Sequence, residues 1–222
     1  MRRGPLVLLL GAACAAPLRP LPPLSAGTAA VDPKALAVQA REAARQTQHE
    51  PSADARLALA TKAVEAGQRC VQAAPASAEC DYALALALGV QARERPSTAT
   101  QGLKVMVALL QKANGLDARM DHGGPARVLA LVLVRAPLWP LGPGDPAAGL
   151  EAARRAVELF PDYAPNQLAL SEARLAAGDQ AGSLAAATRG LALARTAAAE
   201  GEPDAADWVR DGEALLAGKT PR

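Results

Sequence analysis

The sequence predicts an all-α protein, a right-handed superhelix of antiparallel helix hairpins with about nine helices. Three observations support this prediction. Half of the residues are hydrophobic, and most of these are Ala and Leu, which are strong helix formers. Aromatic residues make up only 2% of the chain, and Val and Ile are too sparse for a run of strands. Finally, residues 144–195 state nearly the same pattern twice.

The repeated pattern has a period of 34 residues. Gly144-Asp145 recurs as Gly178-Asp179, and the same offset relates Leu150 to Leu184. This period resembles that of the tetratricopeptide repeat (TPR), a helix–turn–helix unit. One such unit cannot bury its apolar face alone and needs a neighbour to complete its core. The resemblance implies a domain of TPR-like hairpins over residues 32–217.

Each expected helix begins at a capping residue or at a proline of the first turn, because these residues suit a helix start. Prolines and an Asn-Gly pair also mark the expected helix ends. These ends are Pro75, Pro96, Asn114-Gly115 and Phe160-Pro161. The expected starts, in order, are Asp32-Pro33, Ser52, Ser77, Ser97, Pro125, Asp145-Pro146, Pro165, Asp179 and Pro203, with the last helix running toward Leu216.

The N-terminal residues have the layout of a secretory signal peptide over residues 1–13. Two arginines precede a short apolar run, Leu6–Leu10, and three small residues follow it. The order Leu-Gly-Ala-Ala-Cys, which ends at Cys14, resembles a bacterial lipobox. That resemblance implies that Cys14 is lipidated and becomes the first mature residue. The alternative is an ordinary cleaved signal with an incidental cysteine.

Residues 14–31 are expected to be a lipidated cysteine followed by a tether. Four prolines lie between Pro17 and Pro23, and prolines at that density favour an extended, semi-rigid spacer. The most apolar later run, Val128–Val134, is far too short to span a bilayer. We therefore expect attachment to the membrane through lipid alone, on the periplasmic side of a bacterial cell envelope, or else a secreted soluble protein. Residues 218–222 are expected to be a disordered tail.

The charge balance argues against a nucleic-acid partner. The chain has 24 basic and 22 acidic residues, and Arg2 and Arg3 account for the difference. A neutral mature chain with few aromatic residues has neither a basic surface nor a stacking platform for nucleic acid.

No pattern of residues indicates a cofactor, a metal or a catalytic centre. Besides Cys14, only Cys70, Cys80, His49 and His122 are available as soft metal ligands, and they form no paired ligand motif. His122 follows an aspartate, but no nucleophile signature accompanies them, and a polar turn explains the pair. Gly218-Lys219-Thr220 resembles the end of a phosphate loop but lacks the glycine required at position 213. We therefore expect a protein that is not an enzyme.

Cys70 and Cys80 flank Pro75, near the end of one expected helix and the start of the next. Those ends are neighbours in a helical hairpin, so a disulfide is geometrically reasonable. A signal peptide implies an oxidising compartment, in which such a pair would be oxidised. The alternative is two unpaired small residues of the core.

Two aromatic residues lie in expected turns. Trp139, between Pro137 and Pro140, either plugs the end of a hairpin or faces a ligand. Tyr163, which follows Pro161, has the same two interpretations.

Residues 121–190 also resemble a particular set of repeat proteins. These residues contain, in this order, the motifs Gly123–Arg127, Ala136-Pro137, Trp139-Pro140, Gly144-Asp145, Ala156-Val157 and Phe160-Pro161. This order resembles that of the T-component of TRAP transporters, a family of periplasmic lipoproteins. The resemblance implies an all-α superhelix, association with a periplasmic solute-binding protein, and a pore or cleft for a small ligand. The candidate contacts for a partner or ligand are Trp139, Tyr163, Arg127 and His122.

Two functions follow as expectations. The first is a cell-envelope TPR-like scaffold lipoprotein that binds a protein or peptide partner in its concave groove, since stacked repeats curve and form such grooves. The alternative is an accessory of a TRAP-type transport system that binds a small apolar ligand or hands it over.

Overall fold

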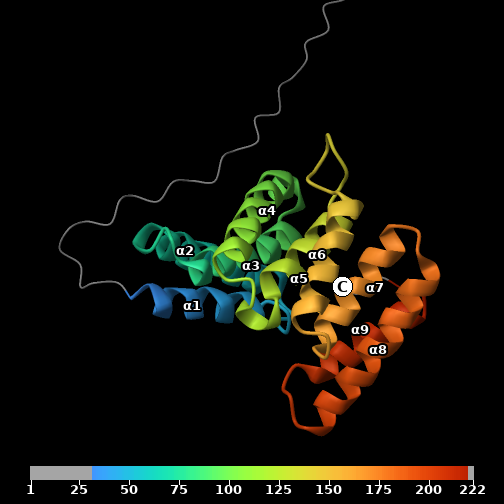
Figure 1. Cartoon of the computed structure of the whole chain (residues 1–222). Helices are drawn as coiled ribbons and strands as arrows, with labels where there is room; N and C mark the ends of the chain where they lie inside the picture. The colour runs from blue at the N-terminus through green and yellow to red at the C-terminus, as the bar shows by residue number, and fades with distance from the viewer. Residues whose placement is uncertain (1–31, 220–222) are drawn as a thin grey trace, which may run out of the picture.

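A computed structural model describes residues 32–219. This part of the chain is all-helical and contains no strand, which confirms the predicted fold class (Figure 1). Its nine α-helices lie close to the predicted ones, and two single turns of 3-10 helix, η1 (Pro96–Thr98) and η2 (Met120–His122), join them. The α-helices are α1 (Pro33–Gln46), α2 (Ala53–Ala73), α3 (Ala78–Glu94), α4 (Ala99–Leu116), α5 (Gly124–Arg135), α6 (Pro146–Leu159), α7 (Ala164–Ala176), α8 (Gln180–Ala199) and α9 (Ala205–Leu216).

The signal peptide, Cys14 and the proline-rich tether of the sequence prediction lie outside the described residues. So does most of the predicted tail. Its first two residues, Gly218 and Lys219, close α9, because their N–H groups donate to the carbonyl oxygens of Leu215 and Ala214.

The predicted capping residues start most of the helices. The side chains of Asp32, Ser52, Ser77, Asp145 and Asp179 each accept a hydrogen bond from a backbone N–H group in the first turn, which satisfies a donor that the helix leaves free.

One predicted cap is wrong. Ser97 lies inside η1, and α4 begins two residues later, at Ala99. Pro96 provides the physical reason, because its ring fixes φ near the value of a helical turn. The chain therefore turns once as 3-10 helix before α4 starts.

Consecutive helices pack as hairpins: α1 with α2, α3 with α4, α5 with α6, and α7 with α8. The odd-numbered helices also contact one another along the stack, as α1 with α3, α5 with α7, and α7 with α9. Figure 1 shows the resulting succession, in which the chain proceeds in order from α1 at one side to α8 at the other. This packing of neighbour on neighbour is consistent with a superhelix of helical hairpins.

Small residues allow neighbouring helices to approach closely. A Cβ atom added to Gly67 of α2 would lie 2.8 Å from Leu84 Cα on α3. One added to Gly190 of α8 would lie 2.6 Å from Leu168 Cδ2 on α7. Much of the remaining core is alanine, including Ala63, which is fully buried. The Ala-rich composition thus produces tight helix crossings around a core of small side chains.

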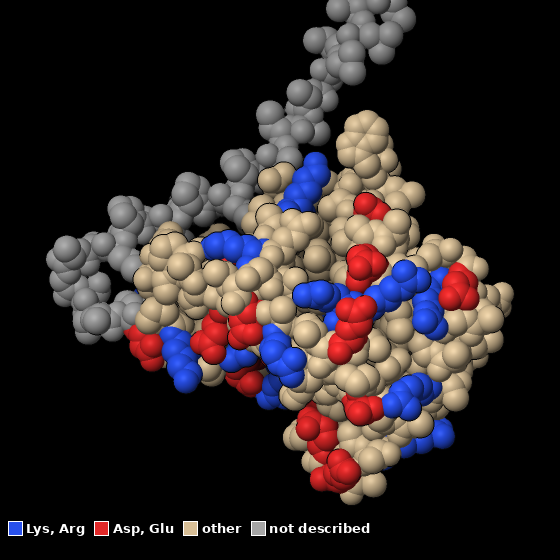
Figure 2. Space-filling model, in the orientation of Figure 1, with Lys and Arg blue, Asp and Glu red and all other residues tan. Residues whose placement is uncertain are grey.

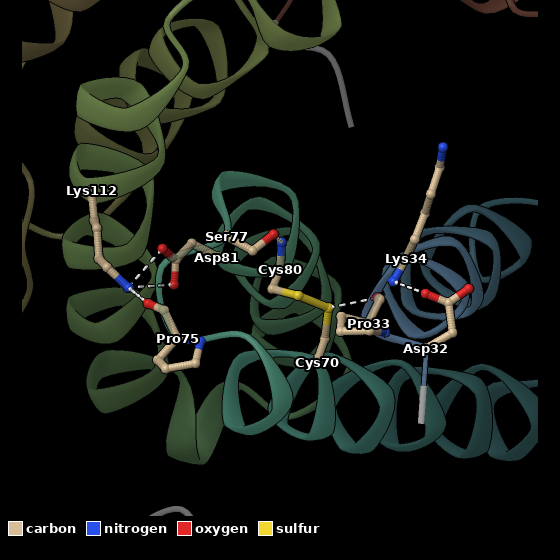
Figure 3. The surroundings of a disulfide bond; sticks show 9 residues. All are labelled: Asp32, Pro33, Lys34, Cys70, Pro75, Ser77, Cys80, Asp81 and Lys112. Carbon is tan, nitrogen blue, oxygen red and sulfur yellow. Dashed lines mark hydrogen bonds and ion pairs between the residues drawn. A yellow bond between two sulfur atoms is a disulfide. The ribbon is translucent and has the colours of Figure 1, made fainter. Parts of the chain in front are cut away.

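A disulfide joins Cys70 near the end of α2 to Cys80 in the first turn of α3, as predicted (Figure 3). Lys112 of α4 binds the same turn from the other side. Its Nζ donates to the carbonyl oxygen of Pro75 at 2.6 Å and pairs with the buried Asp81 carboxylate at 2.8 Å. The first two hairpins are therefore locked together at one end.

Across residues 32–219, each helix is either too short or too polar to traverse a bilayer.

Candidate functional site

A groove of about 470 Å³ lies along one side of the helix stack. Its walls come from α1, α3, α5, α7 and α9, the first helix of each hairpin together with the last helix, and from Asp121 of η2. None of the lining residues belongs to α2, α4, α6 or α8. The odd-numbered helices thus present one face to the groove, while their partners form the outer layer.

The floor of the groove is apolar. It contains Leu86 and Val90 from α3, Val128 and Leu131 from α5, and Leu168 from α7. The first four of these side chains are only half-buried. Covering them with an apolar group of a partner would remove further area from water, which favours binding.

A polar network borders this floor, in which the buried side chains of Tyr82, Arg127 and Asn166 are tied to the more exposed Asp121. The hydroxyl of Tyr82, on α3, donates to Asp121 Oδ2 at 2.5 Å, and Arg127 Nη2, on α5, donates to the same oxygen at 2.7 Å. Arg127 also donates to Asn166 Oδ1 of α7 at 3.1 Å. Burial is the main cause that raises the pKa of Tyr82 far above its ordinary value, so this phenol stays protonated and remains a donor. The network ties three odd-numbered helices together.

The network holds an unusual turn of backbone. Asp121 and His122 have φ values of 48° and 53°, and Gly123 follows with φ of 78°. Left-handed conformations are unfavourable for residues with a Cβ atom. Arg127 and Asn166 offset this by donating to the carbonyl oxygens within the turn, Arg127 to Asp121 and His122, and Asn166 to His122. The two side chains therefore fix the turn and, with it, the direction of the His122 ring.

That ring belongs to a row of aromatic side chains. His122 stacks on Tyr163, with the ring centroids 4.5 Å apart, and meets Phe160 edge-on at 5.4 Å. Tyr163 in turn meets Trp208 of α9 edge-on at 5.4 Å. Of these four residues, Tyr163 and Trp208 line the groove. Three of the five Phe, Tyr and Trp residues of the chain, Tyr82 included, thus line the groove.

The two ends of the helix stack carry opposite charges at the groove. Arg41 and Arg45 lie on α1, and Asp204, Asp207 and Asp211 lie on α9. The pKa of Arg45 is raised, first by its hydrogen bonds to Glu42 and also by the charge of Asp204. Because residues of α1 and of α9 line the same groove, its two charged lips belong to the first and the last helix of the described chain.

Three of these charged groups, Arg41, Asp204 and Asp211, have no ion-pair partner within residues 32–219, whereas Arg45 pairs with Glu42 and Asp207 pairs with Arg210. Burial raises the pKa of the Asp211 carboxyl. The charges of Arg210 and Arg135 lower this pKa, whereas those of Glu172 and Asp207 raise it further. By contrast, Glu172 accepts two hydrogen bonds from Arg135, at 2.6 and 2.8 Å. A cation placed in the groove would therefore meet acidic groups, Asp204 and Asp211, that form no ion pair with another described residue.

The structure brings together three of the four predicted contact residues. Arg127 and Tyr163 line the groove, and the guanidinium carbon of Arg127 lies 5.2 Å from the Tyr163 ring centroid. His122 stacks against Tyr163 just outside the lining.

Trp139 lies elsewhere. It is 85% exposed, at the tip of the loop between α5 and α6, which stands out from the body in Figure 1. The prediction that Trp139 plugs the end of a hairpin is therefore wrong. The backbone supplies the reason: the N–H groups of Leu141 and Gly142 both donate to the Leu138 carbonyl, and this tight turn directs the indole outward.

Sequence reasoning missed Tyr82, Trp208 and the acidic lip of α9. The scarcity of aromatic residues was a usable signal, because in a chain with so few of them a groove is a natural place for several. The charges of α9 gave no such signal, since an acidic helix start has an ordinary explanation in the helix dipole.

The described residues contain no group of His, Cys, Asp and Glu side chains that could hold a metal ion. Positive and negative side chains are intermixed on the face shown in Figure 2, which offers no extended basic surface there. No family model matches this chain, and neither does any curated protein.

Proposed function

We propose that this protein is a TPR-like scaffold of the bacterial cell envelope, anchored through lipid at Cys14, that binds a protein or peptide segment in its concave groove. One observation carries the proposal: five helices from the whole length of the stack converge on a single groove with an apolar floor, an aromatic end and charged lips. Such a groove offers both contact area and polar groups that orient a bound chain.

The proposed location draws on the N-terminal sequence and on one structural feature. A disulfide between Cys70 and Cys80 is compatible with an oxidising compartment such as the periplasm. The lipid anchor itself is proposed from the sequence around Cys14 alone.

A second candidate is the accessory of a TRAP-type transport system, with a periplasmic solute-binding protein as partner. The volume of the groove favours it, because about 470 Å³ falls in the range of small-ligand sites. The charges argue against a purely apolar ligand, since Arg41 and Asp211 would be desolvated without a partner. A peptide or polar segment satisfies these groups better.

Photo-crosslinking in cells tests the proposal. A photoreactive residue replaces Leu131, which is half-buried on the groove floor. The matched control replaces Leu184 of α8, which is 46% exposed and does not line the groove. We expect discrete protein adducts from position 131 and none of the same mass from position 184. Identical adduct patterns from both positions would contradict a groove-specific partner.

A further inference from the structure

We propose that the proline-rich segment of this chain, residues 17–24, binds in the groove and competes there with the partner. This inference rests on the proposed function of the groove. The segment has the sequence Pro-Leu-Arg-Pro-Leu-Pro-Pro-Leu and lies outside the described residues. Its composition favours polyproline II helix, the form in which proline-rich peptides bind to aromatic-lined grooves.

The spacing of the leucines matches such binding. Leu18, Leu21 and Leu24 recur every three residues, and polyproline II helix has three residues per turn. All three leucines therefore fall on one edge of that helix. An edge of this kind complements the apolar floor around Val128 and Leu131, which the protein leaves half-buried.

Aromatic and charged groups of the groove complement the rest of the segment. Tyr163 and Trp208 present ring surface of the kind on which prolines pack. Arg19 is the only charged residue among residues 17–24. The acidic lip supplies Asp207 and Asp211, and Asp211 has no ion-pair partner within the described chain. Both the charges and the apolar surface of the groove thus match residues 17–24.

The connection is long enough. The described chain begins at Asp32, and Arg41 is the first residue of α1 that lines the groove. Arg41 lies eight positions after Pro33 in α1, or about 12 Å along the helix. The seven residues between Leu24 and Asp32 reach about 24 Å when extended. Residues 17–24 can therefore fold back along α1 and enter the groove of their own chain.

Competition gives the contact a regulatory meaning. A segment joined to its own groove acts at a high effective concentration. An external partner must displace it and so binds more weakly than to an open groove. Since the segment leads directly to Cys14, its release would also lengthen the connection between the folded domain and the membrane.

Intramolecular crosslinking tests the contact in the full chain, purified in detergent. A benzophenone amino acid replaces Leu21, and mass spectrometry maps the crosslinked peptides. We expect crosslinks within the chain to α5, α7 or α9, with a yield that does not change on tenfold dilution. The same label at Thr28, outside the segment, should not reach these helices. No crosslink, crosslinks to even-numbered helices, or crosslinks only between two copies would overturn the proposal.

Charge variants check the register. Arg19→Glu should lower the crosslink yield about fivefold, the factor that one exposed ion pair represents. Asp207→Asn with Asp211→Asn should lower it similarly, and combining these changes with Arg19→Glu should show no further loss. Independent, multiplying losses would overturn the pairing of Arg19 with the α9 lip.

The partner assay separates this inference from the function on which it rests. Replacing Pro20, Pro22 and Pro23 with serine keeps the length of the segment but removes its preference for polyproline II helix. If the segment competes, these changes should raise partner capture at position 131 severalfold. Unchanged capture would overturn the competition and leave the groove function standing. Loss of all capture at position 131 in the unaltered chain would instead contradict the groove function.

Discussion

At the scale of single residues, Arg127 is the centre of the candidate site. It lies only 8% exposed, holds the Asp121 carboxylate and donates to carbonyl oxygens of the left-handed turn. A buried cation of this kind is stable only because several acceptors surround it. The same acceptors depend on it in return. The side chain therefore maintains both the shape of the η2 turn and the position of the neighbouring aromatic row.

We predict that Arg127→Met lowers the free energy of unfolding by about 3 kcal/mol, because it leaves Asp121 and Asn166 without their buried partner. Tyr82→Phe removes one hydrogen bond from the same carboxylate and should cost about 1 kcal/mol. Urea denaturation followed by circular dichroism measures both. Equal costs for the two variants would show that Arg127 is not the centre of the network.

Asp211 gives a prediction about pH. Burial raises the pKa of its carboxyl in the folded state, so folding favours the protonated form. The resulting stability is complete below the unfolded pKa of about 4 and is lost as the pH rises through the folded value. Asp211→Asn should therefore be more stable than the unaltered protein at pH 7, by about 0.5 kcal/mol after allowance for solvent screening.

Thermal unfolding at pH 7 and at pH 3.5 checks this prediction. The advantage of Asp211→Asn should shrink at the lower pH, since the aspartate is then neutral as well. An advantage that grows on acidification would contradict the sign of the shift.

At the scale of helices, the sequence was sufficient to predict the structure wherever a single residue decides the local conformation. Asp145-Pro146 and Asp179 each begin a helix, because a side-chain acceptor meets the free N–H groups of a first turn. Cys70 and Cys80 were predictable as a pair since a hairpin brings their helix ends together. In such cases the cause lies within a few residues of the effect.

The sequence was insufficient to predict a local conformation whose cause lies far away in the chain. The left-handed φ of Asp121 and His122 depends on Arg127 and on Asn166. Asn166 lies 44 residues downstream of His122. Tyr82, which donates to the Asp121 carboxylate, lies 39 residues upstream of it. The acidic lip likewise becomes a site only because α9 and α1 line the same groove. No local pattern contains that relation.

Glycines at the helix crossings give the prediction for this scale. Gly67→Ala places a Cβ atom 2.8 Å from backbone atom Leu84 Cα, so α2 and α3 must separate. We expect a loss of about 1–3 kcal/mol. The Cβ atom of Gly102→Ala in α4 would meet no atom within 4 Å. This variant should be more stable by up to about 1 kcal/mol, because alanine loses less conformational entropy in a helix than glycine does. Chemical denaturation of both variants measures the difference, and equal effects would contradict close packing at Gly67.

At the scale of the whole molecule, the helices contact mainly their neighbours in sequence. The α1–α3 and α7–α9 ends of the stack have separate sets of packing partners. Residues of both ends line the groove, and no extensive packing joins α1 to α9. An arrangement of this kind makes stability a sum of local terms. It also allows the groove to open or close without disruption of either end.

The disulfide provides a test of this locality. Cys70 and Cys80 are both buried, so replacing both with alanine removes the bond without adding a polar group to the core. The lost link closes a short loop, with a sequence separation of 10 residues, and its loss should cost about 3 kcal/mol. In a stack of local units, that cost should fall on α1, α2 and α3. Hydrogen exchange there should accelerate about a hundredfold, while amides of α7 and α8 should keep their rates. Reduction of the unaltered protein should reproduce the same pattern. An equal acceleration in all helices would mean that the chain unfolds as a single unit, and the groove could then not move one lip relative to the other.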